Sequence, residues 1–205
     1  MRAGDQASLQ WYRFGKLPPR LLYEILRFRQ AIFVVEQSCA YPDLDGLDQQ
    51  ALHLLLRVGG ENGGELAGCL RLIPFAGEAR VKLSRVAVAE TLRGQGLARR
   101  LMREALARCR RDYSDYAVTL SGQTYLAPFY ESLGFAVTSA PYDDYGLSHV
   151  DMALVPSPAP RPLSARGRAP AGRRINDAPG VDAGDSPRPG EGDSPRPGEG
   201  EPGDA

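Results

Sequence analysis

A short turn at residues 93–98, with the sequence Arg-Gly-Gln-Gly-Leu-Ala, has the residue types best suited to binding an anion. It follows a strand-like run in which Val86 and Val88 are β-branched and alternate with small residues. It precedes a run whose apolar residues recur at helical spacing (Leu97, Leu101, Ala105, Leu106 and Cys109). The first N–H groups of a helix lack intrahelical partners, and glycines let a phosphate approach the backbone. The stretch therefore predicts a strand–turn–helix unit that binds a phosphate, with Arg93 adding a positive charge.

Two common phosphate-binding motifs are excluded. A Walker A loop requires G-x-x-x-x-G-K-[ST], and the chain contains no such string. A dinucleotide-binding fingerprint requires a third glycine, and Arg99 stands at that position. On these residues alone, an ordinary connection between a strand and a helix remains an alternative.

The turn resembles the R/Q-x-x-G-x-G/A signature of the GNAT superfamily of N-acetyltransferases, in which it holds the pyrophosphate of acetyl-CoA. A second feature of that family, a helical Tyr followed by Gly-Phe, is matched downstream by Phe129-Tyr130 and Gly134-Phe135. Upstream, residues 27–48 ("RFRQAIFVVEQSCAYPDLDGLD") are similar to the N-terminal region of the ElaA-like family. The resemblance covers roughly residues 20–155. It implies direct transfer of an acetyl group from acetyl-CoA to an amine of a small molecule or a peptide in a ternary complex, with no metal.

The resemblance also implies which residues contact acetyl-CoA. Val86 and Val88 match the positions where the family presents backbone N–H groups, beside a bulge, to the thioester carbonyl. Gln123 stands where many members have an Asn, so it keeps an amide on a longer side chain. The full set implied for the cofactor is Val86, Ala87, Val88, Arg93, Gly94, Gln95, Gly96, Leu97, Ala98, Gln123 and Tyr130.

Amine attack on a thioester needs a base and an acid. A free alkylamine has a pKa of about 10.4 and must lose a proton, and the departing thiolate must gain one. The family places the Tyr130 position near the sulfur, which makes Tyr130 the candidate acid; a core tyrosine is the alternative. Glu36 and His149 are the candidate bases and His53 is a third, although a lone His on a strand is more often a packed residue. The residues expected in the acceptor pocket are Arg27, Phe33, Glu36, Asp45 and His53.

The acidic stretch at residues 43–48 has a D-x-D-G pattern that invites a calcium interpretation. An EF-hand needs a longer series of ligands that ends in Glu, and that series is absent. We therefore expect no metal, and we expect these acids to face solvent or a cationic amine. Cys39 and Cys69 have no neighbours that would lower a thiol pKa, which disfavours a cysteine nucleophile.

Composition limits the remaining possibilities. Residues 1–155 hold all the aromatic residues and predict one domain, whereas residues 156–205 are rich in Pro and Gly and predict a disordered tail. That tail repeats Gly-Asp-Ser-Pro-Arg-Pro-Gly-Glu in tandem at residues 184–199. A net charge of zero gives no reason to propose nucleic acid. Three cysteines without a C-x-x-C pair, and no run of membrane-spanning length, favour a cytoplasmic protein. The sequence leaves the oligomeric state open between monomer and homodimer.

The hydrophobic pattern predicts a fold of the α/β (α+β) class. With the resemblance, this is the GNAT fold: a mixed, mostly antiparallel sheet flanked by helices, with a V-shaped opening at the cofactor strand. Helices are expected from residue 18, from residue 97 and over residues 125–133, and a loop over residues 142–146. Strands are expected at residues 8–14, 51–58, 66–72, 79–88, 117–121, 135–138 and 149–154.

Two other functions fit part of the sequence. A non-catalytic module that senses acetyl-CoA would keep the turn and use the long tail for interaction. An acyl-homoserine-lactone synthase shares the fold and an R…VF..E stretch, but that family lacks the turn seen at residues 93–98.

Overall fold

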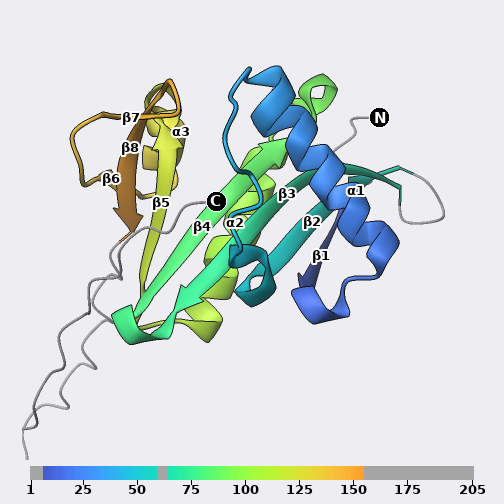
Figure 1. The fold of residues 1–205 in the computed structure, drawn as a ribbon. Coiled ribbons are helices and arrows are strands. Elements are labelled where there is room, and N and C mark those ends of the chain that lie inside the picture. The colour runs from blue at the N-terminus through green and yellow to red at the C-terminus, as the bar shows by residue number, and fades with distance from the viewer. Residues whose placement is uncertain (1–6, 60–63, 155–205) are drawn as a thin grey trace, which may run out of the picture. The chain divides into compact units, whose positions relative to one another are not determined.

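The structure is a computed structural model that describes residues 7–59 and 64–154 (Figure 1). The Pro/Gly-rich segment and its tandem repeat lie outside the described residues, so the predicted domain boundary near residue 155 stays a prediction.

One sheet organises the described part of the chain. Its strands are β1 (Ala7–Arg13), β2 (Leu52–Val58), β3 (Glu65–Phe75), β4 (Arg80–Val88), β5 (Ala117–Gln123), β6 (Ala136–Val137), β7 (Tyr142–Asp144) and β8 (Leu147–Leu154). They lie in the order β1-β2-β3-β4-β5-β8-β6, with β7 paired to β8. The β4–β5 pair is parallel and every other pair is antiparallel. The predicted mixed, mostly antiparallel sheet is therefore confirmed.

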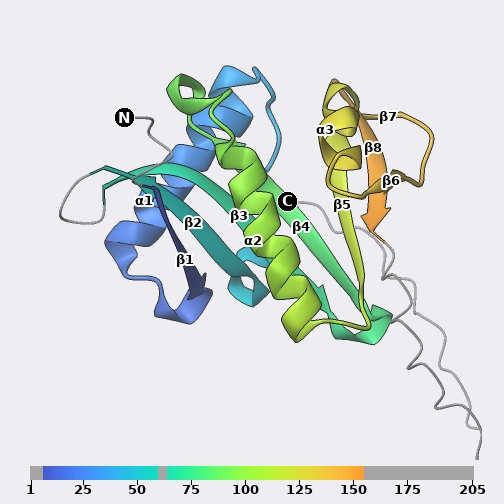
Figure 2. The same cartoon turned by 180° about the vertical axis from the view of Figure 1, so that it is seen from behind.

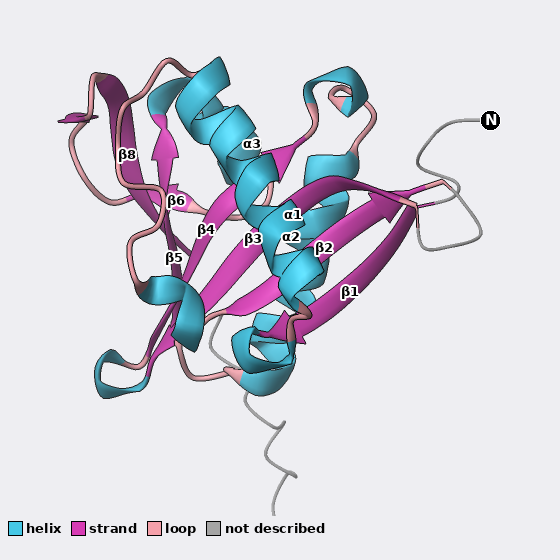
Figure 3. Cartoon of the chain, turned by 45° about the vertical axis from the view of Figure 1, so that its right-hand side comes forward, coloured by secondary structure: helices cyan, strands magenta, loops and turns pink. Residues whose placement is uncertain are grey.

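Helices cover both faces of the sheet. Helix α1 (Pro19–Arg29) crosses one face and α2 (Leu97–Asp112) the other, as the two opposite views show (Figures 1 and 2). Figure 3 shows the same layers with helices and strands coloured apart. The predicted apolar face of α2 is buried against β2, β3 and β4. Ile25 of α1 packs in a smaller cluster on the opposite face with Leu55 and Cys69.

The parallel pair β4–β5 is short, and this opens the sheet. Only residues 80–82 of β4 pair with residues 117–119 of β5, and beyond that point the strands diverge (Figure 1). On its other edge β4 carries a bulge, because its register with β3 shifts between Cys69 and Arg71. Arg85 at the bulge has a φ of +53°. A bulge adds one residue to one strand, interrupts the ladder and increases the local twist. The predicted V-shaped opening at the cofactor strand is thereby present.

Several local predictions need correction. The loop expected at residues 142–146 is wrong in its first half, because β7 and β8 form a hairpin there. The two residues between them, Tyr145 and Gly146, both have positive φ (53° and 84°), as a type I′ turn requires. Tyr-Gly is an uncommon pair for that turn, so the sequence signal was weak. The helix expected at residues 125–133 is a 3-10 turn (Thr124–Leu126) followed by α3 (Ala127–Glu131).

The run at residues 31–36 continues α1 as a π-helical turn (Gln30–Glu36). Ile32 is buried at its inner face, whereas Glu36 lies on the outer side. Glu36 therefore turns away from the core. π-Helical turns widen a helix and often occur at functional sites.

Candidate functional site

A cavity of about 320 Å³ occupies the opening between the diverging strands. Strand β4 supplies residues 82–86 of its wall, and β5 supplies residues 120–123. The π-helical turn, the chain after it, α3 and the β7–β8 hairpin supply the rest: Phe33, Gln37, Cys39, Tyr41, Leu126, Tyr130, Tyr142, Asp144, Tyr145, Leu147 and His149. The cavity therefore brings together Tyr130, the predicted acid, His149, a predicted base, and Gln123, a predicted cofactor contact.

Tyr130 is held rigidly in the wall of this cavity. Its ring packs edge-on against Phe129 and Phe135, with centroids 5.1 and 6.2 Å away. The ring also fits closely over Gly122, where an added Cβ would come within 2.9 Å of it. Its hydroxyl makes no hydrogen bond to any residue that the structure describes. Burial raises the pKa of Tyr130 to about 12, so the phenol keeps its proton at neutral pH and can donate it.

His149 is oriented in the form that a general base needs. Its Nδ1 lies 2.9 Å from the carbonyl oxygen of Leu147, which can only accept, so Nδ1 carries the hydrogen. In neutral imidazole the lone pair is then on Nε2, which bonds to nothing else in the described ranges. The ring stacks on Tyr142 with centroids 6.2 Å apart. Strand pairing places His149 opposite Gln123.

The bulge of β4 reaches the same cavity. Arg85 and Val86 together lie opposite one residue of β3, and both line the cavity wall. An interrupted ladder leaves backbone groups without their usual partners. Such a strand can present an N–H group to an oxygen in the cavity, which is the role expected for Val86. Ala87 is buried in the core on the α1 side.

The glycine turn has the expected strand–turn–helix geometry. Gly94 and Gly96 have φ of 75° and 79°, a conformation that favours glycine, and α2 begins at Leu97. A second cavity, of about 300 Å³, lies here. It is lined by Val88, Leu92, Arg93, Gly94, Gly96, Leu97, Ala98, Arg99 and Phe129. Most residues predicted to hold a pyrophosphate thus surround one hollow, and Gln95 beside them is exposed.

Glu36 lies at the turn, away from the reaction centre. The two terminal nitrogens of the Arg93 guanidinium, Nη1 and Nη2, donate to its carboxylate at 2.7 and 2.8 Å, while Arg93 Nε donates to the Val88 carbonyl oxygen. The hydrogen bond with Glu36 raises the pKa of Arg93 above its ordinary value. Glu36 is not among the residues that line the main cavity. This geometry suits a group that positions Arg93 better than it suits a base.

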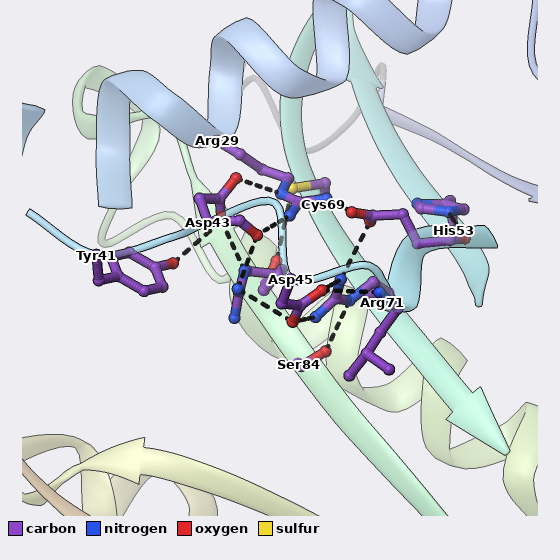
Figure 4. Close-up of polar contacts among 11 residues, drawn as sticks. Arg29, Tyr41, Asp43, Asp45, His53, Cys69, Arg71 and Ser84 are labelled. Carbon is purple, nitrogen blue, oxygen red and sulfur yellow. Dashed lines mark hydrogen bonds and ion pairs between the residues drawn. The ribbon is translucent and has the colours of Figure 1, made fainter. Parts of the chain in front are cut away.

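The acidic stretch is neutralised from within the protein (Figure 4). Arg29, which is 1% exposed, donates to the carboxylates of Asp43 at 3.1 Å and Asp48 at 2.6 Å, and to the Asp43 carbonyl oxygen at 2.9 Å. Tyr41 donates to Asp43 at 3.0 Å. These acids are buried, so the expectation that they face solvent or an amine is wrong for Asp43 and Asp48. A buried carboxylate needs a charged or hydrogen-bonding partner, and the arginines supply it.

Two more arginines complete this cluster. Arg71 of β3 holds Asp45 through two hydrogen bonds of 2.7 and 2.6 Å. Arg85 donates to Asp43 at 2.6 Å and lies 3.3 Å from Asp45. Burial alone would raise the pKa of Asp45, but the Arg71 bond, followed by the Leu47 amide, lowers it to about 2. We name these six residues, Arg29, Arg71, Arg85, Asp43, Asp45 and Asp48, the Arg–Asp cluster.

The other predicted acceptor residues are dispersed. Phe33 lines the cavity, with the Arg85 guanidinium 5.9 Å from its ring centroid. Arg27 is exposed on α1 and does not line the cavity. His53 is 3% exposed beside the Arg–Asp cluster, with Nε2 3.0 Å from the Asp48 carbonyl oxygen, and burial lowers its pKa. Gln123 lines the cavity, and its Nε2 donates to Gln37 Oε1 at 3.1 Å.

The sequence analysis missed three charged residues of the wall, Lys82, Arg85 and Asp144. A signal for Lys82 was present, because it alternates with Val81 and Leu83, which are buried in the core. No local signal marked Asp144, which depends on the unpredicted hairpin.

Three further observations concern metal ligands, a cysteine thiol and membrane-spanning helices. In residues 7–59 and 64–154 no group of three or more His, Cys, Asp or Glu side chains is placed to hold a metal ion. Burial raises the pKa of the Cys69 thiol to about 12, so that thiol stays protonated. No helix among the described residues is long and apolar enough to cross a membrane.

Comparisons of the sequence and of the structure with known proteins point to the same family. The sequence profile of the acetyltransferase (GNAT) domain family matches residues 45–156. Escherichia coli ElaA is 36% identical over 135 residues, which cover 64% of this chain and 86% of ElaA. A UPF0039 protein of Synechocystis is 35% identical over 148 residues, which cover 72% of this chain and 94% of that protein.

Two solved structures share the fold and part of the sequence. The crystal structure of Escherichia coli ElaA has a TM-score of 0.66 at 33% identity and covers 72% of this chain and 99% of its own. An acyl-CoA N-acyltransferase from Pseudomonas aeruginosa has a TM-score of 0.66 at 32% identity, with the same coverage.

Proposed function

Because this chain belongs to the GNAT acetyltransferase family, in its ElaA-like branch, we propose that it transfers the acetyl group of acetyl-CoA to the amine of a small acceptor. Membership of the family supports N-acyl transfer in general. The choice of acetyl-CoA as donor rests on the resemblance and on the fit of the two cavities.

The residues present suit acetyl-CoA. The hollow at the glycine turn offers the start of α2, where unpaired N–H groups and the helix dipole attract a pyrophosphate. Arg93 lies at its rim, held in place by its ion pair with Glu36, so the attraction for the pyrophosphate comes mainly from the start of α2. The opening between β4 and β5 then leads to Tyr130 and the bulge, so an extended pantetheine arm has a channel between the strands.

The reaction divides among three groups of this chain. His149 Nε2 takes a proton from the acceptor ammonium, directly or through water. The neutral amine attacks the thioester carbonyl carbon, and the N–H of Val86 at the bulge stabilises the negative charge that forms on the oxygen. The carbon–sulfur bond then breaks, and Tyr130 gives its proton to the departing thiolate. The attacking nitrogen loses its second proton, through water, to the Tyr130 phenolate, and His149 releases its proton to solvent, so the products are the amide and the CoA thiol. No enzyme nucleophile is involved, which agrees with the protonated Cys69 thiol.

One observation carries this proposal: the Tyr130 hydroxyl and the second ring nitrogen of His149, neither of which has a partner among the described residues, line one cavity at the opening of the sheet. The test is the release of CoA thiol from acetyl-CoA in the presence of a panel of amines. We expect at least one amine to raise release well above hydrolysis. If acetyl-CoA binds and no amine raises release, the protein is an acetyl-CoA sensor instead of an enzyme.

The proposal also includes a cellular compartment and the extent of the catalytic domain. Cys39, Cys69 and Cys109 are free thiols buried in the described part of the chain, which suits a reducing compartment such as the cytoplasm. We also take residues 1–155 as the catalytic domain, since the family profile ends at residue 156.

A further inference from the structure

The cavity wall carries two charges that the protein itself leaves uncompensated. Lys82 and Asp144 line the cavity, and neither makes an ion pair or a side-chain hydrogen bond with any residue that the structure describes. Arg85 also lines it, but Asp43 and Asp45 neutralise that guanidinium. The sequence suggested that the acids of residues 43–48 could face a cationic amine, but the arginines of the Arg–Asp cluster already pair with them. Recognition of the acceptor must therefore depend on other groups.

Lys82 stands at the closed end of the opening. It pairs with Thr119, the last point at which β4 and β5 remain together. Its neighbours Val81 and Leu83 face the α2 side of the sheet. Because successive side chains of a strand point to opposite faces, Lys82 and Ser84 lie on the other face, at the cavity. Lys82 is half-buried. A half-buried ammonium without a counter-charge is unfavourable, and an anionic ligand would relieve that cost.

Asp144 stands at the open end. It pairs with Leu147, two residues beyond His149 on β8, and His149 in turn lies opposite Gln123 at the end of β5. From Thr119 to Gln123 is four residues, or about 13 Å along the strand. Tyr130, over Gly122, lies between the two ends. The cavity is therefore positive at its base and negative at its mouth, with the reacting groups in between.

The anion that Lys82 meets cannot come from the expected donor. The pantetheine arm of CoA is uncharged, and its phosphates belong at the glycine turn around the start of α2. The acceptor must then supply the anion. A volume of about 320 Å³ suits a small molecule.

We propose that the acceptor is a small amino acid-type zwitterion, which carries an amine and a carboxylate on one molecule, and that the extended Lys82 side chain binds the carboxylate while the amine faces His149. Asp144 at the mouth attracts the ammonium form before it loses its proton. The exposed rings of Tyr142 and Tyr145 border the space for a side chain. This inference rests on the proposed function for the role of the amine.

The test measures binding of product-like probes to the full chain saturated with CoA, by calorimetry. The probes are N-acetyl-alanine and N-acetyl-phenylalanine, each compared with its carboxamide. We expect at least one acid to bind about tenfold more tightly than its amide, because an ionic hydrogen bond is lost in the amide. Lys82→Met should remove this difference, and Lys82→Arg should retain much of it.

Lys16 is the matched control, since it is the other lysine of the chain and lies exposed in the 3-10 turn at Phe14–Lys16. Lys16→Met should leave the acid-over-amide preference unchanged. Equal binding of acid and amide, no binding of either acid, or a preference that survives Lys82→Met would each overturn the inference. Binding of the acids through Lys82 without any amine-dependent CoA release would instead contradict the proposed function alone.

Discussion

The role of Tyr130 follows from its surroundings more than from its residue type. Two aromatic rings and Gly122 fix its ring, while its hydroxyl stays unpartnered at the cavity. A core tyrosine with a satisfied hydroxyl was the alternative, and the described contacts do not provide that partner. The proton that a leaving thiolate needs is therefore available without prior rearrangement.

Tyr130→Phe should lower kcat about 100-fold while acetyl-CoA affinity stays the same, because only the proton donor is removed. Steady-state thiol release and calorimetry measure the two quantities. Since burial raises the pKa of Tyr130 to about 12, its phenol remains protonated well above neutrality. The wild-type kcat should then show no loss attributable to this acid between about pH 7 and about pH 10. An unchanged kcat in Tyr130→Phe would show that the proton comes from elsewhere.

At the scale of single residues, site residues that lie within a recognisable motif could be predicted from the sequence. Residues whose place in the site depends on other parts of the chain could not. Tyr130 and Gly96 carry a local signature, so both could be predicted. Glu36 was a candidate base, but its partner Arg93 is distant in the chain and no local pattern revealed that pair. Asp144 depended on a hairpin whose turn residues are uncommon.

At the scale of elements, the turn before α2 depends on glycine for two separate reasons. Gly96 has a φ of 79°, and a side chain there would also stand beside the expected phosphate path. An added Cβ meets nothing within 4 Å, so the substitution is free of clashes within the protein. The effect of a side chain on stability and its effect on binding can therefore be separated.

Gly96→Val should weaken acetyl-CoA binding at least tenfold, since the side chain obstructs the approach of the pyrophosphate to the backbone. The matched control is Gly46→Val, because Gly46 has nearly the same φ, 77°, and the same open surroundings but lies far from the turn. Both variants should lose a similar free energy of unfolding, about 1–2 kcal/mol, from the left-handed backbone. Equal acetyl-CoA affinity in the two variants would remove the turn from the cofactor site.

The positions of helices and strands were predicted well where a long hydrophobic pattern marks them. They were predicted less well where pairing between strands determines the structure. Helix α2 and strands β2 to β4 match their hydrophobic patterns, because one face of each is buried in the same core. The two-residue β6 exists only through its pairing with β8, and the β7–β8 hairpin depends on the uncommon Tyr-Gly turn between its strands. The bulge at Arg85, which gives the site its shape, leaves no pattern in the sequence that alternation alone could reveal.

At the scale of the whole described part, the Arg–Asp cluster connects α1, the acidic stretch, β3 and β4 (Figure 4). It fixes the chain that borders one side of the cavity. Its three arginines balance its three aspartates, so it stabilises the fold only while all partners are present.

Arg29→Met should lower the free energy of unfolding by about 3–5 kcal/mol, because it leaves Asp43 and Asp48 buried with one partner fewer. Arg27→Met changes an exposed arginine of the same helix and should alter stability by less than about 0.5 kcal/mol. Denaturant unfolding measures both. Equal effects would mean that the cluster contributes little to stability.

Acid should weaken the same cluster. The pKa of Asp45 falls from its usual 3.8 to about 2 in the folded protein, so its charged form stabilises the fold above about pH 4. That contribution is lost as pH falls from about 4 towards about 2, where the folded protein must take up the proton. Asp45→Asn should flatten the decline of stability in this interval. A decline as steep as in the wild type would assign the acid sensitivity to other carboxylates.

A crystal structure of the protein with acetyl-CoA would show directly whether acyl-CoA binds in the opening between β4 and β5. We expect the pyrophosphate at residues 93–98, the thioester oxygen on the Val86 N–H, and the sulfur within hydrogen-bond reach of the Tyr130 hydroxyl. A cofactor bound elsewhere, or a thioester distant from both Tyr130 and His149, would contradict it.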